Sequence, residues 1–372
     1  MKNIEVSDKH VGLRVVLFIV ALVLAVSAFS FGVTSIGKKE SGYQSVSSSG
    51  DFAFSYYFEG TSNSIKKQLK ALKSVYSSIL TDYCDQLDTS IATLNSNLGK
   101  EVSVPSSVYA VLKDAYNKTC LGKNFNMFAG ALYAEWKSIL ILDDASEFDP
   151  LNNEYMAYRI SEIAKEVSDL SNFSLEFLDD TTCTIRFNVS DHYAAFASEF
   201  ELEASVLDLN LMTNAYKLSL IASELEAQGY DNGYLVSSEG LVVTLSECSE
   251  QKIVLYGLEE AFESSSGGSS VVERGSVAVS GAASKVYMSA FSFGTYYNAT
   301  VNGRLRHLFF DTTTGEINDV ILACSIISEG SAVSVVEDMA QLLYLCSLKT
   351  KEAVEASLES VGLESFVDCQ FY

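Results

Sequence analysis

LMTNAYKLSLIASELEAQG, residues 211–229, is followed by YLVSSEGLVVTL, residues 234–245, and these two segments decide the fold class. Apolar residues recur every three or four positions in the first segment, which predicts a helix from Leu211 to Gln228 that ends at Gly229. The second segment is rich in β-branched and apolar residues and predicts a strand. The chain therefore combines long helices with strands that lie close together in sequence.

Both kinds of segment recur on either side. Helices are predicted at 65–87, 105–121, 153–170, 331–346 and 351–362. Strands are predicted at 52–58, 174–179, 182–188, 252–258, 276–279, 285–293, 306–311, 320–327 and from 365 onward. Helices beside clustered antiparallel strands predict an α+β fold, with mixed or antiparallel sheets packed against helices.

The N-terminus predicts membrane attachment. Residues 15–33 are apolar except for two serines and a glycine, and as a helix this run is about 28 Å long, enough to cross a bilayer core. Residues 1–14 then form a cytoplasmic tail, 34–50 a Ser/Gly-rich linker, and 51–372 an extracytoplasmic domain on a single-pass anchor in the cell membrane. A cleaved signal peptide is the alternative, because 26–28 (VSA) is a tolerable cleavage site.

Charge and cysteine usage exclude several classes of function. The net charge of −23 argues against nucleic-acid binding, which needs a basic surface. The seven cysteines include no CxxC pair and are widely spaced, which favours buried thiols over a disulfide framework. Three histidines exclude a histidine-rich metal site.

Seven short motifs in order carry a resemblance that none of them carries alone. They are FEGT (58–61), the stretch from Leu94 to Trp136, DLNLMTNAY (208–216), LVSSEG (235–240), SFGTY (292–296), HLFFDTTTG (307–315) and DMAQL (338–342). In this order they resemble the ApbE-type FAD:protein FMN transferases. Those are extracytoplasmic, Mg-dependent enzymes that cut FAD and attach FMN to a Ser or Thr of a partner protein.

The resemblance implies roles for individual residues. His307 is the implied catalytic residue near the phosphates, and Asp338 is the implied Mg ligand. The implied FAD-binding residues are Gly60, Thr61, Asp208, Tyr216, Gly240, Gly294, Tyr296 and Asp311. Ordinary fold roles are the alternative for most of these residues. They are a hydrogen-bonded histidine at a strand end for His307, a carboxylate near a helix N-terminus for Asp338, core aromatics for Tyr216 and Tyr296, turn glycines for Gly240 and Gly294, and a strand-end residue for Asp208.

Several positions depart from the family pattern. The family lysine is Asn214 here, one glycine of its Gly-Gly pair is Glu239, and the Mg-ligating threonine is Leu342. Further departures lie at Asn126, Asn210, Leu211, Ala215 and Thr312. Glu239 adds bulk and negative charge where phosphates would lie, and the loss of a lysine and a threonine weakens charge stabilisation of the cleavage step.

Three hypotheses follow for the function. The chain is a divergent FMN transferase that uses FAD and Mg, or a membrane-anchored pseudoenzyme that binds a partner protein or a flavin without chemistry. The loss of three parts of the machinery favours the second hypothesis. The third is an unrelated surface or adhesion domain, since likeness of fold does not establish function.

Overall fold

The computed structural model describes most of the chain beyond residue 39. The described residues are 40–47, 53–60, 65–71, 75, 80–122, 124–142, 144–258, 271–289, 298–302, 304–330, 334–360 and 365–372. The predicted membrane span, 15–33, lies outside them. No helix within the described part is long and apolar enough to cross a membrane.

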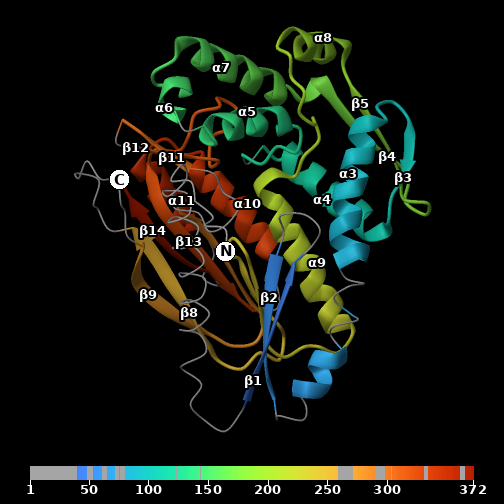
Figure 1. Cartoon of the computed structure of the whole chain (residues 1–372), viewed down its shortest axis with the longest axis vertical. Helices are drawn as coiled ribbons and strands as arrows, with labels where there is room; N and C mark the ends of the chain where they lie inside the picture. Colours follow the sequence, from blue (N-terminus) through green and yellow to red (C-terminus); the bar gives the residue numbers. More distant parts are fainter. Residues whose placement is uncertain are drawn as a thin grey trace, which may run out of the picture.

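A seven-stranded antiparallel sheet is the centre of the molecule (Figure 1). Its strands, in spatial order, are β1 (Glu40–Ser47), β2 (Ala53–Gly60), β6 (Tyr234–Ser237), β7 (Val242–Thr244), β10 (Ala283–Ser289), β13 (Ile321–Glu329) and β14 (Ser365–Phe371). β13 is buried over almost its whole length. Such a strand reads as a continuous apolar run because both of its faces are covered.

Different elements cover the two faces of this sheet. Helices α9 (Thr213–Ala227) and α10 (Val335–Cys346) pack against β6, β7, β10 and β13. The hairpin of β8 (Gln251–Leu258) and β9 (Val271–Val279) contacts β13 and encloses a smaller core cluster around Ile253 and Leu255. Buried side chains on the face of the sheet that α9 and α10 cover belong to the main core.

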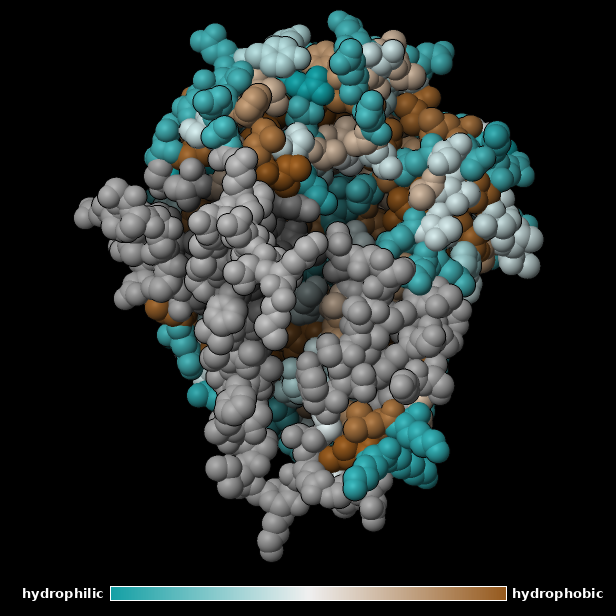
Figure 2. Space-filling view, in the orientation of Figure 1, coloured by the Kyte–Doolittle hydropathy of each residue, from teal (hydrophilic) through white to brown (hydrophobic). Residues whose placement is uncertain are grey.

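The remaining elements form the upper and right-hand parts of Figure 1. A three-stranded sheet contains β3 (Glu101–Ser103), β5 (Thr184–Val189) and β4 (Phe173–Asp179). Around it lie α3 (Gln86–Ser96), α4 (Ser106–Cys120), α5 (Gly130–Leu140), α6 (Ala145–Phe148), α7 (Glu154–Ser168) and α8 (Asp191–Glu199). Stacked rings of Phe128, Phe173 and Phe187 join the sheet to this helical part. Hydrophilic residues dominate the outer rim over α7 and α8, with hydrophobic residues between them (Figure 2).

Short elements complete the fold. They are β11 (Asn298–Val301), β12 (Arg304–His307), α11 (Lys351–Ser360), a π-helical turn (Leu80–Asp85), and 3-10 turns at Leu170–Asn172 and Asn210–Met212. The predicted α+β class with antiparallel sheets is confirmed. The expected signals also act where predicted: Pro105 precedes α4, and Gly229 follows α9 with a φ of +80°.

Four local predictions differ from the structure. Residues 40–47, within the predicted linker, form β1 because a full antiparallel ladder with β2 compensates for their Ser/Gly-rich composition. In the helix predicted at 65–87, the described residues are helical at 65–71 and 75 and form a π-turn at Leu80–Asp85, and α3 extends beyond the predicted end to Ser96. The strand predicted at 234–245 is broken by a turn into β6 and β7. Helix α8 was not predicted, because its nine residues bury only Tyr193 and Phe196.

The cysteines differ from the prediction in one pair. Cys324 of β13 and Cys369 of β14 are register partners and form a disulfide, although the spacing favoured buried thiols throughout. Five cysteines are free, and three of them are buried. A disulfide between adjacent strands depends on register, which cysteine spacing alone does not reveal.

Candidate functional site

Asp338 lies in the first turn of α10, after the N-cap Ser334. Its two carboxylate oxygens accept hydrogen bonds from the hydroxyls of Ser284, on β10, and Ser328, on β13, the latter at 2.7 Å. Burial raises the pKa of Asp338, against the opposing effect of these two hydrogen bonds. The carboxylate therefore fastens α10 to two neighbouring strands.

A magnesium ion needs several oxygen ligands, so the surroundings of Asp338 can be tested for that chemistry. Its hydrogen-bond partners are two serine hydroxyls, and Leu342, one turn further along α10, is fully buried in the core. Among the described residues there is no group of three or more His, Cys, Asp or Glu side chains arranged to hold a metal. The described residues therefore do not fit a divalent cation at Asp338.

Glu239 and Asn214 occupy two of the departures from the family pattern, and they contact each other. Asn214 lies in the first turn of α9, and its side-chain amide donates a hydrogen bond to Glu239, in the turn between β6 and β7. Only 1% of Glu239 is exposed. A helix N-terminus attracts anions, and here a carboxylate of the chain lies beside it.

His307 ends β12 and is 2% exposed. Its Nδ1 accepts a hydrogen bond from the backbone N–H of Phe309 at 3.2 Å, whereas the buried Nε2 has no hydrogen-bond partner among the described residues. Burial, assisted by the charge of Arg306, lowers the pKa of His307 to about 3. The imidazole is therefore neutral at physiological pH.

Arg306, the neighbour of His307, forms a buried ion pair. Its Nε lies 2.7 Å from Oδ2 of Asp149, and the two side chains are 7% and 0% exposed. The guanidinium also lies 5.4 Å from the centre of the Trp136 ring. These contacts hold β12 against the helical part of the molecule, so they position His307 indirectly.

Asp311 and Gly315 form one tight loop after β12. Oδ1 of Asp311 accepts hydrogen bonds from the backbone N–H and the hydroxyl of Thr313, and Lys349 lies 3.4 Å from Oδ2. Although burial acts to raise the pKa of Asp311, these hydrogen bonds hold it below the usual value. Gly315 has a φ of +75°, and its carbonyl accepts a hydrogen bond from Trp136 Nε1.

Tyr216 is buried on α9 and belongs to a polar network. Its hydroxyl donates to Asp114 at 2.6 Å, and Lys118 of α4 bridges Asp114 to Glu337, the residue before Asp338. Burial and the hydrogen bond to Asp114 raise the pKa of Tyr216 well above its usual value. The ring of Tyr216 belongs to the main core.

Asp208 lies at the end of a loop that other retained residues hold in place. Its Oδ1 accepts a hydrogen bond from the backbone N–H of Asn210 at 2.7 Å, and burial raises its pKa. The side chain of Asn95 donates a hydrogen bond to the carbonyl of Leu207 and accepts one from its backbone N–H. A Cβ added to Gly130 would lie 2.1 Å from the carbonyl oxygen of Ser205, so only glycine fits there.

The other implied FAD-binding residues fall into two groups. Gly60 ends β2, opposite Glu40, and Gly240 has a φ of +86° in the turn beside Glu239. Thr61, Gly294 and Tyr296 lie outside the described residues. His307, Asp311 and Asp338 thus come from three different elements, and each is bonded to its own local partners.

Sequence reasoning missed Ser284, Ser328 and Lys118 as neighbours of the implied site. The two serines sit in apolar strands, where a lone serine gives no signal of its partner. Lys118 lies on the helix α4 and reaches across to α10. Only the register of the sheet and the packing of the helices bring these residues to Asp338.

The fold matches solved flavin transferases. The ApbE protein of Thermotoga maritima aligns with a TM-score of 0.58 and 13% identity, over 89% of this chain and 94% of that one. The flavin transferase ApbE of Vibrio cholerae aligns with a TM-score of 0.54 and 11% identity, over 90% and 97%. No family model and no curated protein sequence matches the chain. The resemblance that the ordered motifs indicated is thus confirmed at the level of the fold.

Proposed function

We propose that this chain is a non-catalytic protein on the flavin-transferase fold, anchored in the cell membrane, that binds a partner protein or a flavin outside the cytoplasm. The observation that supports this most is the Asn214–Glu239 pair. A buried carboxylate lies beside the N-terminus of α9, where a phosphate would otherwise be attracted, and would repel the pyrophosphate of FAD.

The residues that match the family pattern and those that depart from it have different roles in the molecule. Asn95, Gly130, Trp136 and Gly315, which match the family pattern, hold loops and helices together. The departures at Asn214, Glu239 and Leu342 fall where charge stabilisation of pyrophosphate cleavage would be needed. This division is what loss of chemistry with retention of the fold would produce.

A second candidate, a working FMN transferase, is favoured by one observation. The Nε2 of His307 is buried and has no hydrogen-bond partner among the described residues, so it is able to accept a bond from a ligand or a hydroxyl. In that reaction the pyrophosphate bond of FAD breaks, FMN is transferred to a Ser or Thr oxygen, and AMP leaves.

One experiment separates the two candidates. FAD is titrated calorimetrically into the full-length protein in detergent, with and without Mg²⁺, and AMP release is then measured in the presence of a candidate acceptor protein. Our proposal predicts no Mg-dependent binding and no AMP above the blank. Mg-strengthened binding together with AMP release would establish the transferase instead. A shorter fragment must begin before Glu40, because β1 pairs with β2 along its whole length.

The membrane location is a separate part of the proposal. It rests on the apolar run 15–33, and the Cys324–Cys369 disulfide supports an oxidising compartment, where such bonds persist. Protease added to intact cells is expected to degrade the domain, and cell fractionation is expected to recover the full chain with membranes. A protected domain would place it on the cytoplasmic side.

A further inference from the structure

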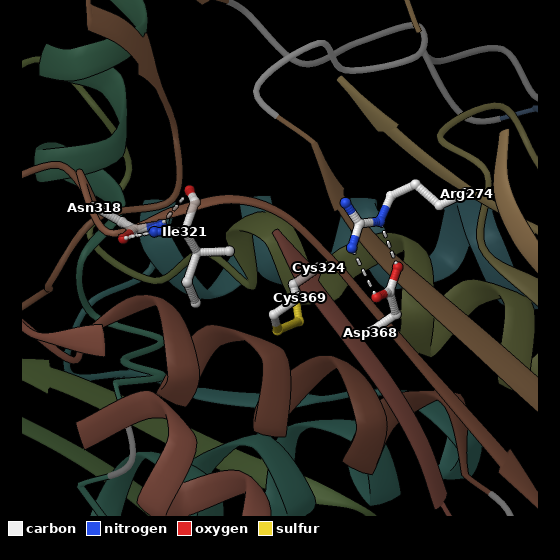
Figure 3. Close-up of a disulfide and its surroundings, with 6 residues drawn as sticks. All are labelled: Arg274, Asn318, Ile321, Cys324, Asp368 and Cys369. Atoms are coloured by element: carbon white, nitrogen blue, oxygen red, sulfur yellow. Dashed lines mark hydrogen bonds and ion pairs between the residues drawn. A yellow bond between two sulfur atoms is a disulfide. The ribbon is translucent and has the colours of Figure 1, made fainter. Parts of the chain in front are cut away.

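The C-terminal strand β14 is fastened through both of its faces (Figure 3). Its odd-numbered residues Val367, Cys369 and Phe371 pack toward the main core, and Cys369 is bonded there to Cys324 of β13. The adjacent residue Asp368 has the opposite orientation and makes a two-pronged ion pair with Arg274 of β9, at 2.8 and 3.1 Å. Neighbouring positions thus fix one strand to two different elements.

These contacts matter because β14 is the last strand in the order of the large sheet and so lies at its edge. Among the described residues the ladder of β14 runs to β13, and that ladder is irregular between Ile321 and Ala323. An edge strand that pairs on one side is usually less stable than the strands inside a sheet. The Arg274–Asp368 pair is partly exposed, so it contributes little by itself.

We propose that the Cys324–Cys369 disulfide is a redox-dependent latch that keeps β14 on the sheet in an oxidising environment and releases it when thiols reduce the bond. This inference does not depend on the proposed function. It makes the strength of closure at the sheet edge conditional on the compartment, because reduction removes the covalent link between β13 and β14. The ladder, the packing of Val367 and Phe371 on the main core and the partly exposed ion pair of Asp368 remain.

The two cysteine residues differ in exposure, and we expect this difference to set the order of the reaction. Cys324 is 1% exposed, whereas Cys369 is only partly buried. The thiolate of a dithiol attacks the sulfur of Cys369, forms a mixed disulfide with it, and displaces the thiolate of Cys324. The second thiol of the reductant then releases Cys369, so that two electrons and two protons pass to the protein and the reductant becomes a cyclic disulfide.

The first measurement counts free thiols. The full-length protein is denatured without reductant, alkylated and weighed by mass spectrometry. Five adducts are expected, because two of the seven cysteines are bonded to each other, and seven after reduction with dithiothreitol. Seven adducts without reductant would overturn the proposal.

The second measurement tests the latch itself. Dithiothreitol is added to the folded protein, followed by carboxypeptidase digestion and thermal unfolding. Reduction is expected to speed removal of Phe371 and Tyr372 at least tenfold and to lower Tm by about 5–10 °C. Digestion and Tm that are unchanged by reduction would show that β14 is held without the bond and would overturn the latch.

Matched variants assign the effect to this pair. Cys120→Ser removes an exposed free thiol and is expected to respond to reductant as the natural chain does. The double variant C324A/C369A is expected to behave as reduced protein whether or not reductant is present. If that variant does not fold, the comparison of the natural protein with and without dithiothreitol still tests whether the disulfide holds β14 on the sheet. Arg274→Ala, which removes the second fastening, is expected to make the effect of reduction larger.

Discussion

Asn214 and Glu239, 25 positions apart, meet at the N-terminus of α9, where the amide of one donates to the buried carboxylate of the other. Compared with the flavin-transferase pattern, a lysine and a glycine have been replaced by a pair that is self-consistent. The two departures thus contact each other directly, and Glu239 is buried beside the start of α9.

Coupling between these residues is measurable. Glu239→Ala is expected to lower the free energy of unfolding by about 2–3 kcal/mol, because it leaves a small cavity and removes the acceptor of the half-buried Asn214 amide. Asn214→Ala removes the donor and is expected to cost about 1–3 kcal/mol. Because each change removes the same hydrogen bond, the double variant should cost at least 0.5–1 kcal/mol less than the sum. Urea unfolding of the four proteins gives the values, and strict additivity would contradict the pairing.

The same pair offers a gain-of-function test of the proposed function. The variant N214K/E239G restores the family residues, so it removes the negative charge and adds a positive one. We expect FAD affinity to rise at least tenfold over the natural chain in calorimetric titration, as charge complementarity with the pyrophosphate returns. Asn214→Gln, which keeps the charge unchanged, is the control. If the restored variant binds no better than this control, the pair does not exclude the phosphates.

Sequence patterns predicted the parts of this fold that depend on local signals. Pro105 before α4 and Gly229 after α9 act on their own neighbours, so no knowledge of packing is needed. β1 was mistaken for linker because its stability comes from pairing with β2. Asn214 and Glu239 were each identified as departures, but their contact depends on how α9 sits on the sheet. Ser284 and Ser328 gave no signal, because a serine in a buried strand has no characteristic spacing.

The buried ion pair of Arg306 with Asp149 is expected to tolerate joint replacement better than single replacement. Asp149→Ala leaves the guanidinium buried without its carboxylate, and we expect a loss of about 3–5 kcal/mol in the free energy of unfolding. Replacing both residues, as in D149L/R306M, should recover at least half of that loss, because no charge remains buried. Chemical denaturation measures all three variants.

The control is an exposed ion pair whose arginine, Arg304, also lies in β12. Arg304 and Asp319 are 2.7 Å apart, but their side chains are 57% and 49% exposed. Arg304→Ala is therefore expected to cost less than about 1 kcal/mol. Equal losses for Asp149→Ala and Arg304→Ala would show that burial does not govern the strength of these pairs.

His307 should make the protein sensitive to mild acid. Its pKa in the folded state is lowered to about 3, below the ordinary value of 6.5, so the unfolded chain takes up the proton first as pH falls. The titration of His307 does not affect the free energy of unfolding above pH 6.5. As pH falls from 6.5 to about 3, it lowers the free energy of unfolding increasingly. Relative to His307→Gln, which keeps an acceptor for the N–H of Phe309 but does not titrate, the natural chain should lose about 2 kcal/mol from pH 8 to pH 5.

Urea unfolding at several pH values tests this expectation. His192, whose side chain is 69% exposed, is the matched control, and His192→Gln should change the free energy of unfolding by less than about 1 kcal/mol. A difference between the natural chain and His307→Gln that stays constant from pH 8 to pH 5 would mean that the imidazole reaches solvent or a charged partner.

Lys285 should produce a pH dependence of the same sign in alkali, where stability also rises with pH. This lysine is buried in the middle of the sheet, where its Nζ donates to the carbonyl of Val254 at 2.8 Å and lies 5.4 and 5.2 Å from the ring centres of Tyr256 and Tyr287. Burial lowers its pKa to about 8, from 10.5. The folded state therefore releases its proton before the unfolded state does, so the cost of the buried charge is full below pH 8 and is relieved as pH rises toward 10.5.

Lys285→Met keeps an unbranched side chain of similar length and removes the titrating group, so it isolates this effect. The free energy of unfolding of the natural chain, taken relative to this variant, is expected to rise by about 2–3 kcal/mol between pH 7 and pH 10. Ionisation of tyrosines and free cysteines affects both proteins and cancels in the difference. A difference that does not change with pH would mean that the tyrosine rings and the Val254 carbonyl hold the ammonium as well as water does, and the burial penalty would then be absent.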